Sequence, residues 1–497
     1  MQANVLDFGA VPDGQTLDTA AIQAALDACA PAGGTVYIPA GRYLSGSVFL
    51  HSNTTLHLEA GAILLGSQDP EDYPIIPGRW EGVQQEVHAP LIAGHGLTTI
   101  AVTGRGIIDG QGALWWELFR EKRLLYPRPR LLSFTECKNV LIEGITAINS
   151  PSWTITPVCC ENVTIDKVTV ANPPDSPNTD GINPDSCCNV HISNCHVDVG
   201  DDCITIKSGT EAIPLQERRP CENLTITNCT MLHGHGGVVI GSETSGDVRN
   251  VVISNCVFIG TDRGIRLKSR RGRGGVVEDI RVNNVIMEKV LCPFAMNLYY
   301  ACGRWGDPVI SDKEPQPITD STPRFRRVTL SHLTAQDAQI AAGFVYGLAE
   351  MPVEDLALND ISISLDSQAE PGYPDMADGL ELMQRAGLFL RNVHGLRLEH
   401  VEITGQSGPA FWIQDAAQVE ISRCTTPTPG TQTPVIHLEN VKGGFVHGCW
   451  AAPETNMFLH LSGEHSQGIC TANNALENAA IPTHIDTGVP KNAIHPL

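Results

Sequence analysis

The sequence is short of aromatic and basic residues. Aromatic side chains make up 5% of the 497 residues, and 33 Lys and Arg stand against 55 Asp and Glu, giving a formal charge of −22. A field of that sign disfavours nucleic acid and anionic membranes as partners. It would also repel an acidic substrate, unless a local basic cluster reversed it. Few aromatics beside 47 Gly and 33 Pro favour many short strands and turns.

Targeting and disulfide signals are also missing. The N-terminal MQANVLDFGAVPDG lacks the basic and apolar regions of a signal peptide, and no apolar run reaches the length of a membrane span. The sixteen cysteines form no disulfide framework, and none has zinc-site spacing. We expect reduced thiols and a cytoplasmic protein, although a chain whose leader had been removed would look the same. Oligomeric state is left open.

A short phrase recurs along the chain: Asn, an alternation of apolar and polar residues, then Asn or Asp, then Cys or an aliphatic residue. The clear copies are NVLIEGI at 139, NVTIDKV at 162, NVHISNC at 189, NLTITNC at 223 and NVVISNC at 250. Weaker copies begin at 279, 327, 355, 395, 418 and 444. The alternation is that of a strand with one buried face and lacks the 3.6-residue spacing of helical repeats, and most steps are shorter than a propeller blade. We assign the repeated Asn and Cys to side-chain ladders that stabilise the stack.

The repeat therefore predicts an all-β chain, a right-handed parallel β-helix forming a single domain over residues 1–497. A solenoid needs a cap, and residues 18–29 read as a short amphipathic helix with Ile22, Ala25, Leu26 and Cys29 on its apolar side and Asp18 as N-cap. We expect the cap and first coils over about 1–60. The longest interruption predicts an inserted loop near the site at about 290–326.

Four polar clusters interrupt consecutive copies of the repeat: NTDG at 178–181, GDD at 200–202, GHG at 234–236 and RLK at 266–268. Similar offsets from the repeat predict that they stack on one face and form a groove on the order of 15 Å long. Asp180, Asp201 and Asp202 should then lie close together. Three such carboxylates cannot all ionise freely, so one could protonate a glycosidic oxygen while another activates water.

Basic residues gather in one segment of this acidic chain. Strand alternation in GIRLKS places Arg266 and Lys268 on the same outward face, suited to a substrate that carries carboxylates. Arg270, Arg271 and Arg273 could equally form a solvated basic loop. His235, between two glycines, is given a supporting role beside the carboxylates.

At these residues the sequence resembles glycoside hydrolase family 28, the polygalacturonases, and its long insertions are similar to those of bacterial exo-acting members. NTDGI, GDDCITIKSG, GHGGVVIGSE and RGIRLKS look like that family's four signatures, in order. The resemblance implies an inverting hydrolase that needs no metal or other cofactor. It implies Asp201 as general acid, Asp180 and Asp202 positioning and activating water, and His235 assisting. Asn178, Arg266 and Lys268, with Tyr300 in preference to Tyr299, are the implied contacts to substrate.

The expected partner is thus a galacturonate-containing oligosaccharide, cleaved at α-1,4-galacturonosyl linkages, with exo-action preferred. Endo-polygalacturonase and rhamnogalacturonan-directed activity remain alternatives. Two further alternatives come from other classes: a calcium-dependent pectate-lyase-like enzyme, and a carbohydrate-binding β-helix with no catalysis.

Overall fold

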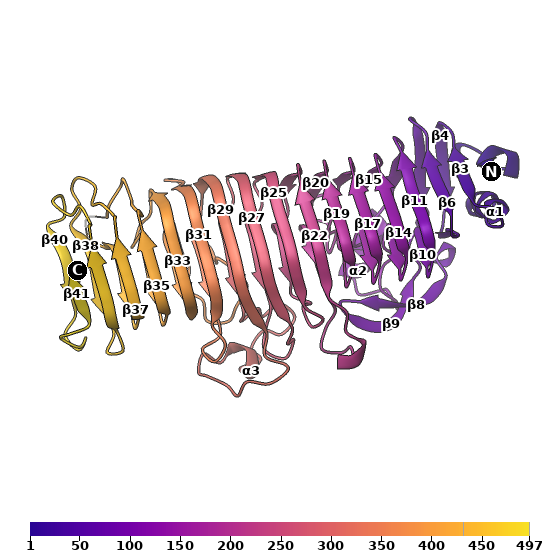
Figure 1. Cartoon of the computed structure of the whole chain (residues 1–497). Helices are drawn as coiled ribbons and strands as arrows, with labels where there is room; N and C mark the ends of the chain where they lie inside the picture. The colour runs from indigo at the N-terminus through magenta and orange to yellow at the C-terminus, as the bar shows by residue number, and fades with distance from the viewer. Residues whose placement is uncertain (431, 497) are drawn as a thin grey trace. The chain divides into compact units, whose positions relative to one another are not determined.

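The computed structural model describes residues 1–430 and 432–496. The chain divides into two compact units: unit 1 is Met1–Val239 with Ser245–Val251, and unit 2 is Ile240–Thr244 with Val252–Leu497. In unit 1 a typical coil adds two strands to one parallel sheet and one strand to a second, whereas in unit 2 each coil adds one strand to each of two parallel sheets (Figure 1). Strands β24 (Gly236–Gly241) and β25 (Val248–Ile259) contain residues of both units. No helix in the described ranges is long and apolar enough to cross a membrane.

Unit 1 has one long sheet, one short-stranded sheet, a hairpin and two helices. Its long sheet contains β1 (Gln2–Asn4), β2 (Asp13–Leu17), β3 (Gly34–Ile38), β4 (Gly41–Ser45), β6 (Thr54–Leu58), β7 (Ala62–Gly66), β11 (Thr98–Gly104), β12 (Ile107–Asp109), β14 (Lys138–Glu143), β15 (Thr146–Ile148), β17 (Glu161–Asp166), β18 (Thr169–Ala171), β19 (Cys188–Ser193), β20 (His196–Val199), β22 (Cys221–Thr227) and β23 (Thr230–His233). The short-stranded sheet contains β5 (Val48–Phe49), β10 (Ile92–His95), β13 (Leu132–Thr135) and β16 (Ile155–Val158). Outside these two sheets are β21 (Asp202–Ile206) and the antiparallel hairpin of β8 (Ile75–Trp80) and β9 (Val83–His88). The helices are α1 (Thr19–Cys29) and α2 (Ala113–Arg120), and single 3₁₀ turns lie at Val5–Phe8, Pro70–Asp72 and Leu215–Glu217.

Unit 2 repeats the two-sheet pattern with longer strands. One sheet contains β27 (Val276–Glu288), β29 (Arg324–Ala338), β31 (Val353–Leu365), β33 (Val393–Thr404), β35 (Ala417–Ser422), β37 (Lys442–His447), β39 (Gln467–Ala472) and β41 (Ile494–Pro496). The other contains β26 (Arg263–Lys268), β28 (Cys292–Asn297), β30 (Ala341–Tyr346), β32 (Ala386–Arg391), β34 (Phe411–Gln414), β36 (Pro434–Glu439), β38 (Met457–Ser462) and β40 (Ile481–Ile485). The short helix α3 (Pro308–Ser311) lies between β28 and β29. The predicted fold, a right-handed parallel β-helix, is confirmed.

The core consists of aliphatic residues stacked in register. In unit 1 the second residue of each repeat phrase aligns with its equivalents: Val140, Val163, Val190 and Leu224. In unit 2 the equivalent column is Ile280, Val328, Leu356, Leu396 and Val419. All of these side chains are buried. A slip of one residue would turn every such side chain outward, so this pattern fixes the register of the coils.

The repeated Asn residues form the predicted ladder. Asn139, Asn162, Asn189, Asn223 and Asn250 all have φ between 55° and 59°, the left-handed region that Asn tolerates better than most residues. Each amide nitrogen donates to the amide oxygen of the preceding Asn, at 3.0 or 3.1 Å. The same residue therefore makes the chain turn and joins neighbouring coils.

The cysteines also stack, as the repeat predicts. The backbone N–H of Cys160 donates to the sulfur of Cys187, at 3.4 Å. Burial raises the pKa of Cys187 and of Cys221, which keeps these thiols protonated and unreactive. All sixteen cysteines are free. The twelve buried ones serve as small apolar residues of the core.

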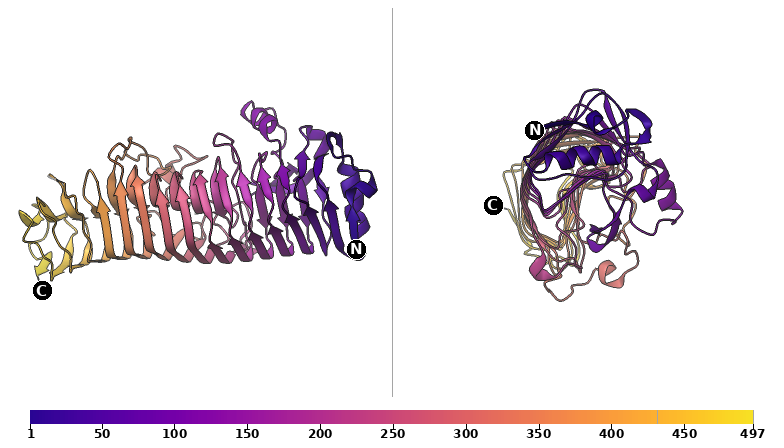
Figure 2. Two further views of the ribbon diagram at one scale, coloured as in Figure 1. Left: turned by 90° about the horizontal axis from the view of Figure 1, so that it is seen from above. Right: turned by 90° about the vertical axis from the view of Figure 1, so that its right-hand side faces the viewer.

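Helix α1 buries the four residues predicted for its apolar side, Ile22, Ala25, Leu26 and Cys29, and covers the first coils of unit 1 (Figure 2). The prediction for Asp18 is wrong in one respect. Asp18 precedes the helix, but its side chain makes no bond to helical N–H groups and accepts instead from the N–H of Val11, at 2.7 Å. Asp18 therefore holds the segment that leads into β2 rather than the helix end.

Several segments leave the coils, among them the following three. In unit 1 the hairpin β8–β9 projects beside the short-stranded sheet (Figure 1). In unit 2 residues 298–323, including α3, form a loop between β28 and β29, and residues 366–385 form another between β31 and β32. The inserted loop expected at about 290–326 thus starts later, because residues 292–297 are strand β28. The single domain over 1–497 stays a prediction.

Asn189→Ala should lower the free energy of unfolding by about 2 kcal/mol, because Ala disfavours a positive φ and cannot join the ladder. Asn189→Gly keeps the backbone conformation and should cost about half as much. Urea denaturation of both variants measures the difference. Equal losses would show that the ladder, and not the backbone conformation, sets the cost.

Candidate active site

Asp180 and Asp202 occupy equivalent positions on neighbouring coils of unit 1. A parallel bridge pairs Ile182 with Ile204, and the N–H of Gly181 donates to the carbonyl of Asp202 at 3.0 Å. In a parallel stack this register separates the two backbones by about 4.8 Å. Both side chains are buried. The predicted proximity of these two carboxylates is therefore present in the fold.

Asp201 lies beside His235 at the surface of the same unit. The N–H of His235 donates to the carbonyl of Asp201 at 3.0 Å, and His235 Nδ1 lies 3.3 Å from Asp201 Oδ1. Gly234 has φ 75°, and a Cβ there would be only 2.6 Å from the same carbonyl, which explains the glycine before His235. The Asp201 side chain is 23% exposed, so it is the member of the acidic cluster open to a ligand.

Asp180 is held by polar groups that the sequence did not single out. Its Oδ2 lies 3.5 Å from Lys207 Nζ and accepts from Asn183 Nδ2 at 3.1 Å. Lys207 Nζ also lies 3.8 Å from the centre of the Trp153 ring. The ammonium group is thus placed between a carboxylate and an aromatic face, both of which favour its charge.

Arg128 supports the loop that carries NTDG. Its guanidinium donates to the carbonyls of Pro151 and Pro177 and to Asn178 Oδ1, at 2.7 to 2.8 Å. Burial lowers the pKa of Arg128 to about 10, so the group remains charged at neutral pH. Because Asn178 Oδ1 accepts from Arg128, the structure gives Asn178 a part in holding the loop, and its contact with substrate stays a prediction.

A cavity of about 550 Å³ in unit 1 adjoins this loop. Its lining includes Arg79, Trp80, Arg128 and Arg130, with Trp80 contributed by the hairpin β8–β9. Trp80 stacks on Trp153 with ring centres 5.1 Å apart and planes 14° from parallel. The stacked indoles link the cavity to Lys207 and hence to Asp180. The size suits a small ligand, and the guanidinium groups favour an anionic one.

In unit 2, Arg266, Lys268 and Tyr300 form one cluster. The guanidinium of Arg266 and the ammonium of Lys268 lie 5.4 and 5.1 Å from the centre of the Tyr300 ring. Tyr299, the alternative, is 1% exposed, and its ring faces Arg271 and Lys313 instead. The predicted choice of Tyr300 over Tyr299 thus agrees with the grouping of side chains. The alignment of this cluster with the carboxylates of unit 1 stays a prediction.

Asp375 is the buried counter-ion of Arg266. Its Oδ1 accepts from Arg266 Nε at 3.1 Å, from Arg266 Nη2 at 2.5 Å and from the N–H of Met376 at 2.8 Å. Burial alone would raise the pKa of Asp375, but Arg266 and Arg263 hold it below its usual value. Asp375 therefore fixes the direction of Arg266 and offsets its charge.

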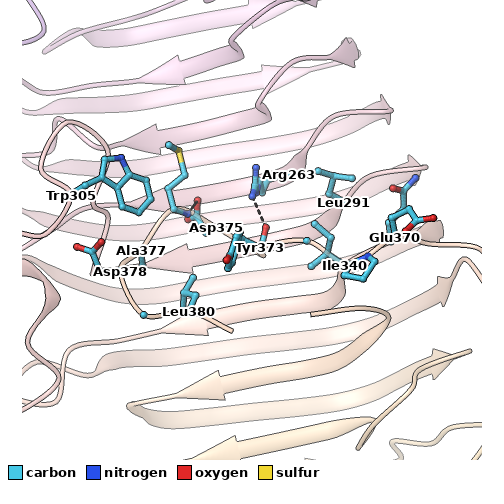
Figure 3. Close-up of a pocket in the computed structure, with 15 residues that line it drawn as sticks. Arg263, Leu291, Trp305, Ile340, Glu370, Tyr373, Asp375, Ala377, Asp378 and Leu380 are labelled. Atoms are coloured by element: carbon cyan, nitrogen blue, oxygen red, sulfur yellow. Dashed lines mark hydrogen bonds between the residues drawn. The ribbon is translucent and has the colours of Figure 1, made fainter. Parts of the chain in front are cut away.

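A second cavity, of about 620 Å³, lies beside Asp375 in unit 2 (Figure 3). Loop 366–385 forms much of its wall, with Tyr373 and Asp378 in its lining, and Trp305 reaches it from loop 298–323. Arg263 Nη2 donates to the carbonyl of Tyr373 at 2.9 Å, as Figure 3 shows, and so ties the loop to strand β26. Two excursions from the coils thus meet at the wall that carries Asp375.

The interpretation of the basic segment as a solvated loop is wrong for two of its three residues. Arg270 and Arg271 are each only 6% exposed. Arg271 donates to both carboxylate oxygens of Glu350, at 2.7 and 2.9 Å. Arg271 is therefore part of a buried ion pair.

The model of the family described as "Glycosyl hydrolases family 28" matches residues 34–373, about two thirds of the chain, and this range includes Asp180, Asp201, Asp202, His235, Arg266, Lys268 and Tyr300. The chain belongs to glycosyl hydrolase family 28. A second model, "Rhamnogalacturonase A/epimerase, pectate lyase-like", matches residues 2–62. Asp375 lies just beyond the residues that the family 28 model matches.

Relatives of known name and structure agree with the family. A protein from Vitis vinifera named "Probable polygalacturonase" is 35% identical over 74% of this chain and 75% of its own length. The exopolygalacturonase of Thermotoga maritima is 30% identical, with a TM-score of 0.69, over 81% of this chain and 91% of that one. A family 28 exopolygalacturonase of Yersinia enterocolitica is 25% identical, with a TM-score of 0.72, over 86% of this chain and 78% of that one.

Sequence reasoning missed Lys207, Arg128 and Asp375. Lys207 lies within GDDCITIKSG, six residues after Asp201, so strand alternation predicts the same face for both and could have drawn attention to it. Arg128 lies outside every repeat phrase, and Asp375 is 109 residues from Arg266 in a loop without a pattern. For these two residues no local signal existed.

Asp201→Asn should reduce turnover of the family 28 enzyme by about 10³-fold, because an amide cannot transfer the proton that general acid catalysis requires. Asp198→Asn is the matched control: Asp198 lies in the same coil, and its Oδ1 is 2.9 Å from His233 Nδ1. Initial rates on oligogalacturonide measure both, with thermal unfolding to verify the fold. Equal rates in the two variants would show that Asp201 is not the group that donates the proton.

Asp375→Asn should lower the free energy of unfolding by about 3–5 kcal/mol and raise KM, because Arg266 would remain buried without a counter-ion. Asp262→Asn is the control, since Asp262 pairs with Arg263 at 3.3 Å but is 36% exposed. The lowered pKa of Asp375 means that its contribution is complete above about pH 4 and is lost as the pH falls through that lowered pKa. Urea denaturation across this pH range should show the dependence in the parent and not in Asp375→Asn.

Proposed function

We propose that this enzyme hydrolyses α-1,4-galacturonosyl linkages of oligo- and polygalacturonate with inversion at the anomeric carbon. The observation that carries the proposal is the register that stacks Asp180 on Asp202 and leaves Asp201 exposed beside them. Glycoside hydrolysis needs one carboxyl group to protonate the leaving oxygen and one carboxylate to activate water. Membership of family 28 and the names of the relatives support the same reaction.

The burial of the three carboxylates suggests how they divide the work. Asp201, next to His235, is the member exposed enough to donate a proton to the glycosidic oxygen. Asp180 and Asp202 are buried, and the ammonium of Lys207 beside Asp180 favours its ionised form. The ionised pair would hold a water molecule and accept its proton as it attacks the anomeric carbon. The proton donated by Asp201 is restored from solvent after the product leaves.

Basic groups support the preference for an acidic sugar. The chain carries a charge of −22, which would repel polygalacturonate unless cations gathered locally. Arg266 and Lys268 in unit 2, and Arg79, Arg128 and Arg130 around the cavity in unit 1, are such groups. Arginine suits this task because its planar fork matches a carboxylate.

Exo-action is the mode that we propose. The hairpin β8–β9 walls the cavity of unit 1, and a walled site accepts the end of a chain more readily than its middle. The exopolygalacturonases of Thermotoga maritima and Yersinia enterocolitica are among the similar structures. Endo-action and rhamnogalacturonan-directed activity remain the alternatives.

Time-resolved product analysis on a defined hexagalacturonide tests the reaction and its mode together. Exo-action should release one short product from the first turnover, whereas endo-action gives mixed lengths. Trp80→Ala should open the wall of the cavity and increase the share of mixed lengths, while Trp450→Ala, an exposed tryptophan of unit 2, should not. A chelator-sensitive activity that releases unsaturated, ultraviolet-absorbing products would instead identify a lyase.

We also propose a cytoplasmic location. All sixteen cysteines are free, and most are buried as core residues, which fits a reducing compartment. Only short, imported oligosaccharides would then reach the enzyme, in agreement with exo-action. Finding the activity in the periplasmic or culture fraction of the source cells would contradict this location.

A further inference from the structure

Three side chains of unit 2, outside the candidate active site, converge at one point. They are His460 on β38, His484 on β40 and Asp486, which follows β40 directly. Their ligand atoms all lie within 4.8 Å of one another. In the described part of the chain, no other group of three His, Cys, Asp or Glu residues meets this condition.

The coil register creates the cluster. His460 aligns with His484 on the next coil, and with His437 of β36 on the coil before, so three histidines stand in one column. The N–H of Asp486 donates to the carbonyl of Leu461 at 3.0 Å, which fixes the carboxylate beside the column. The spacing of the two histidines is therefore set by the backbone of two paired strands.

The imidazoles are oriented by their neighbours. His460 stacks on His437, with ring centres 4.4 Å apart and planes 8° from parallel. His437 does not join the cluster, because its Nε2 lies 2.8 Å from the hydroxyl of Ser462. His460 is the best covered of the three, with a side chain 21% exposed. The stack leaves Nε2 of His460 directed toward Asp486.

The distances match a metal site. Nε2 of His460 and Nε2 of His484 lie 3.0 and 3.2 Å from the same oxygen, Oδ1 of Asp486. Ligands about 2.0–2.1 Å from a tetrahedral zinc ion are about 3.3–3.4 Å apart. Only a small outward shift would admit an ion between these atoms, and the acidic chain favours cation binding.

We propose that His460, His484 and Asp486 bind one divalent transition-metal ion, with zinc as the preferred ion. Two imidazole nitrogens and one carboxylate oxygen are ligands typical of Zn²⁺, and a water molecule would complete a tetrahedron. The ion would join β38 to β40, which is the last strand in the order of its sheet among the described residues. Its effect would be to strengthen unit 2, with no part in the hydrolysis.

The test uses the full-length protein, without a histidine tag and freed of metal by a chelator. Calorimetric titration with ZnCl₂ should show one site per chain, and Zn²⁺ should raise Tm by a few degrees because it binds the folded state. CoCl₂ should give the visible absorption of four-coordinate Co²⁺. His484→Gln and Asp486→Asn should each weaken binding by about 100-fold or more and abolish both effects.

His400→Gln is the matched control. His400 and His332 flank Asp360 in the same unit but approach different oxygens of it, at 2.9 and 3.6 Å. This variant should bind Zn²⁺ as the parent does, and all variants should keep hydrolytic activity. If the parent binds no Zn²⁺, the three side chains form a hydrogen-bonded cluster only. If the parent and Asp486→Asn bind Zn²⁺ equally well, the metal binds elsewhere. Either result overturns the proposal. If His484→Gln does not fold, Asp486→Asn, which keeps the shape of the side chain, decides alone.

Discussion

Parallel stacking of coils in register is the constraint on which every other feature of this protein depends. Neighbouring strands lie about 4.8 Å apart, and each coil must turn sharply to begin the next. In unit 1 that turn is made by Asn residues with a left-handed backbone conformation, and their side-chain amides form hydrogen bonds from one coil to the next. Once the turns align, inward aliphatic residues align too. Equivalent outward residues then form columns, whether or not they stabilise the fold.

Columns of polar residues bring together the side chains of the candidate sites in this fold. Asp180 and Asp202 share one column of unit 1, and the histidines of β36, β38 and β40 share another in unit 2. A column brings like groups together at a spacing set by the backbone. Like charges at that spacing repel, so each acidic column needs a compensating group from elsewhere. Lys207 provides it for Asp180.

Burial of charge explains why an acidic chain can hold so many ordered cations. Arg128, Arg266 and Arg271 are all buried, and each is matched to carbonyls or a carboxylate. Removing one partner of a buried ion pair lowers the free energy of unfolding strongly, because the other charge is left buried without a counter-ion. Replacing both partners with well-packed apolar residues often changes that free energy little. Segments between strands supply these partners: loop 366–385 supplies Asp375 to Arg266, and the connection between β30 and β31 supplies Glu350 to Arg271. Loop 366–385 thus fixes Arg266, whereas the register of the coils fixes Asp180 and Asp202.

The sequence by itself determined the repeat, the parallel β-helix, the Asn and Cys stacks, the apolar side of α1 and the pairing of Asp180 with the GDD segment. All of these follow from local alternation repeated at a nearly constant period, which is visible in one dimension. Only the tertiary structure decided the role of Asp18, the burial of Arg270 and Arg271, the support that Arg128 gives Asn178, and the Asp375 counter-ion of Arg266. Apart from the bond between Asp18 and Val11, seven residues away, these contacts join segments tens of residues apart through loops without a pattern, and their geometry exists only after the coils have stacked.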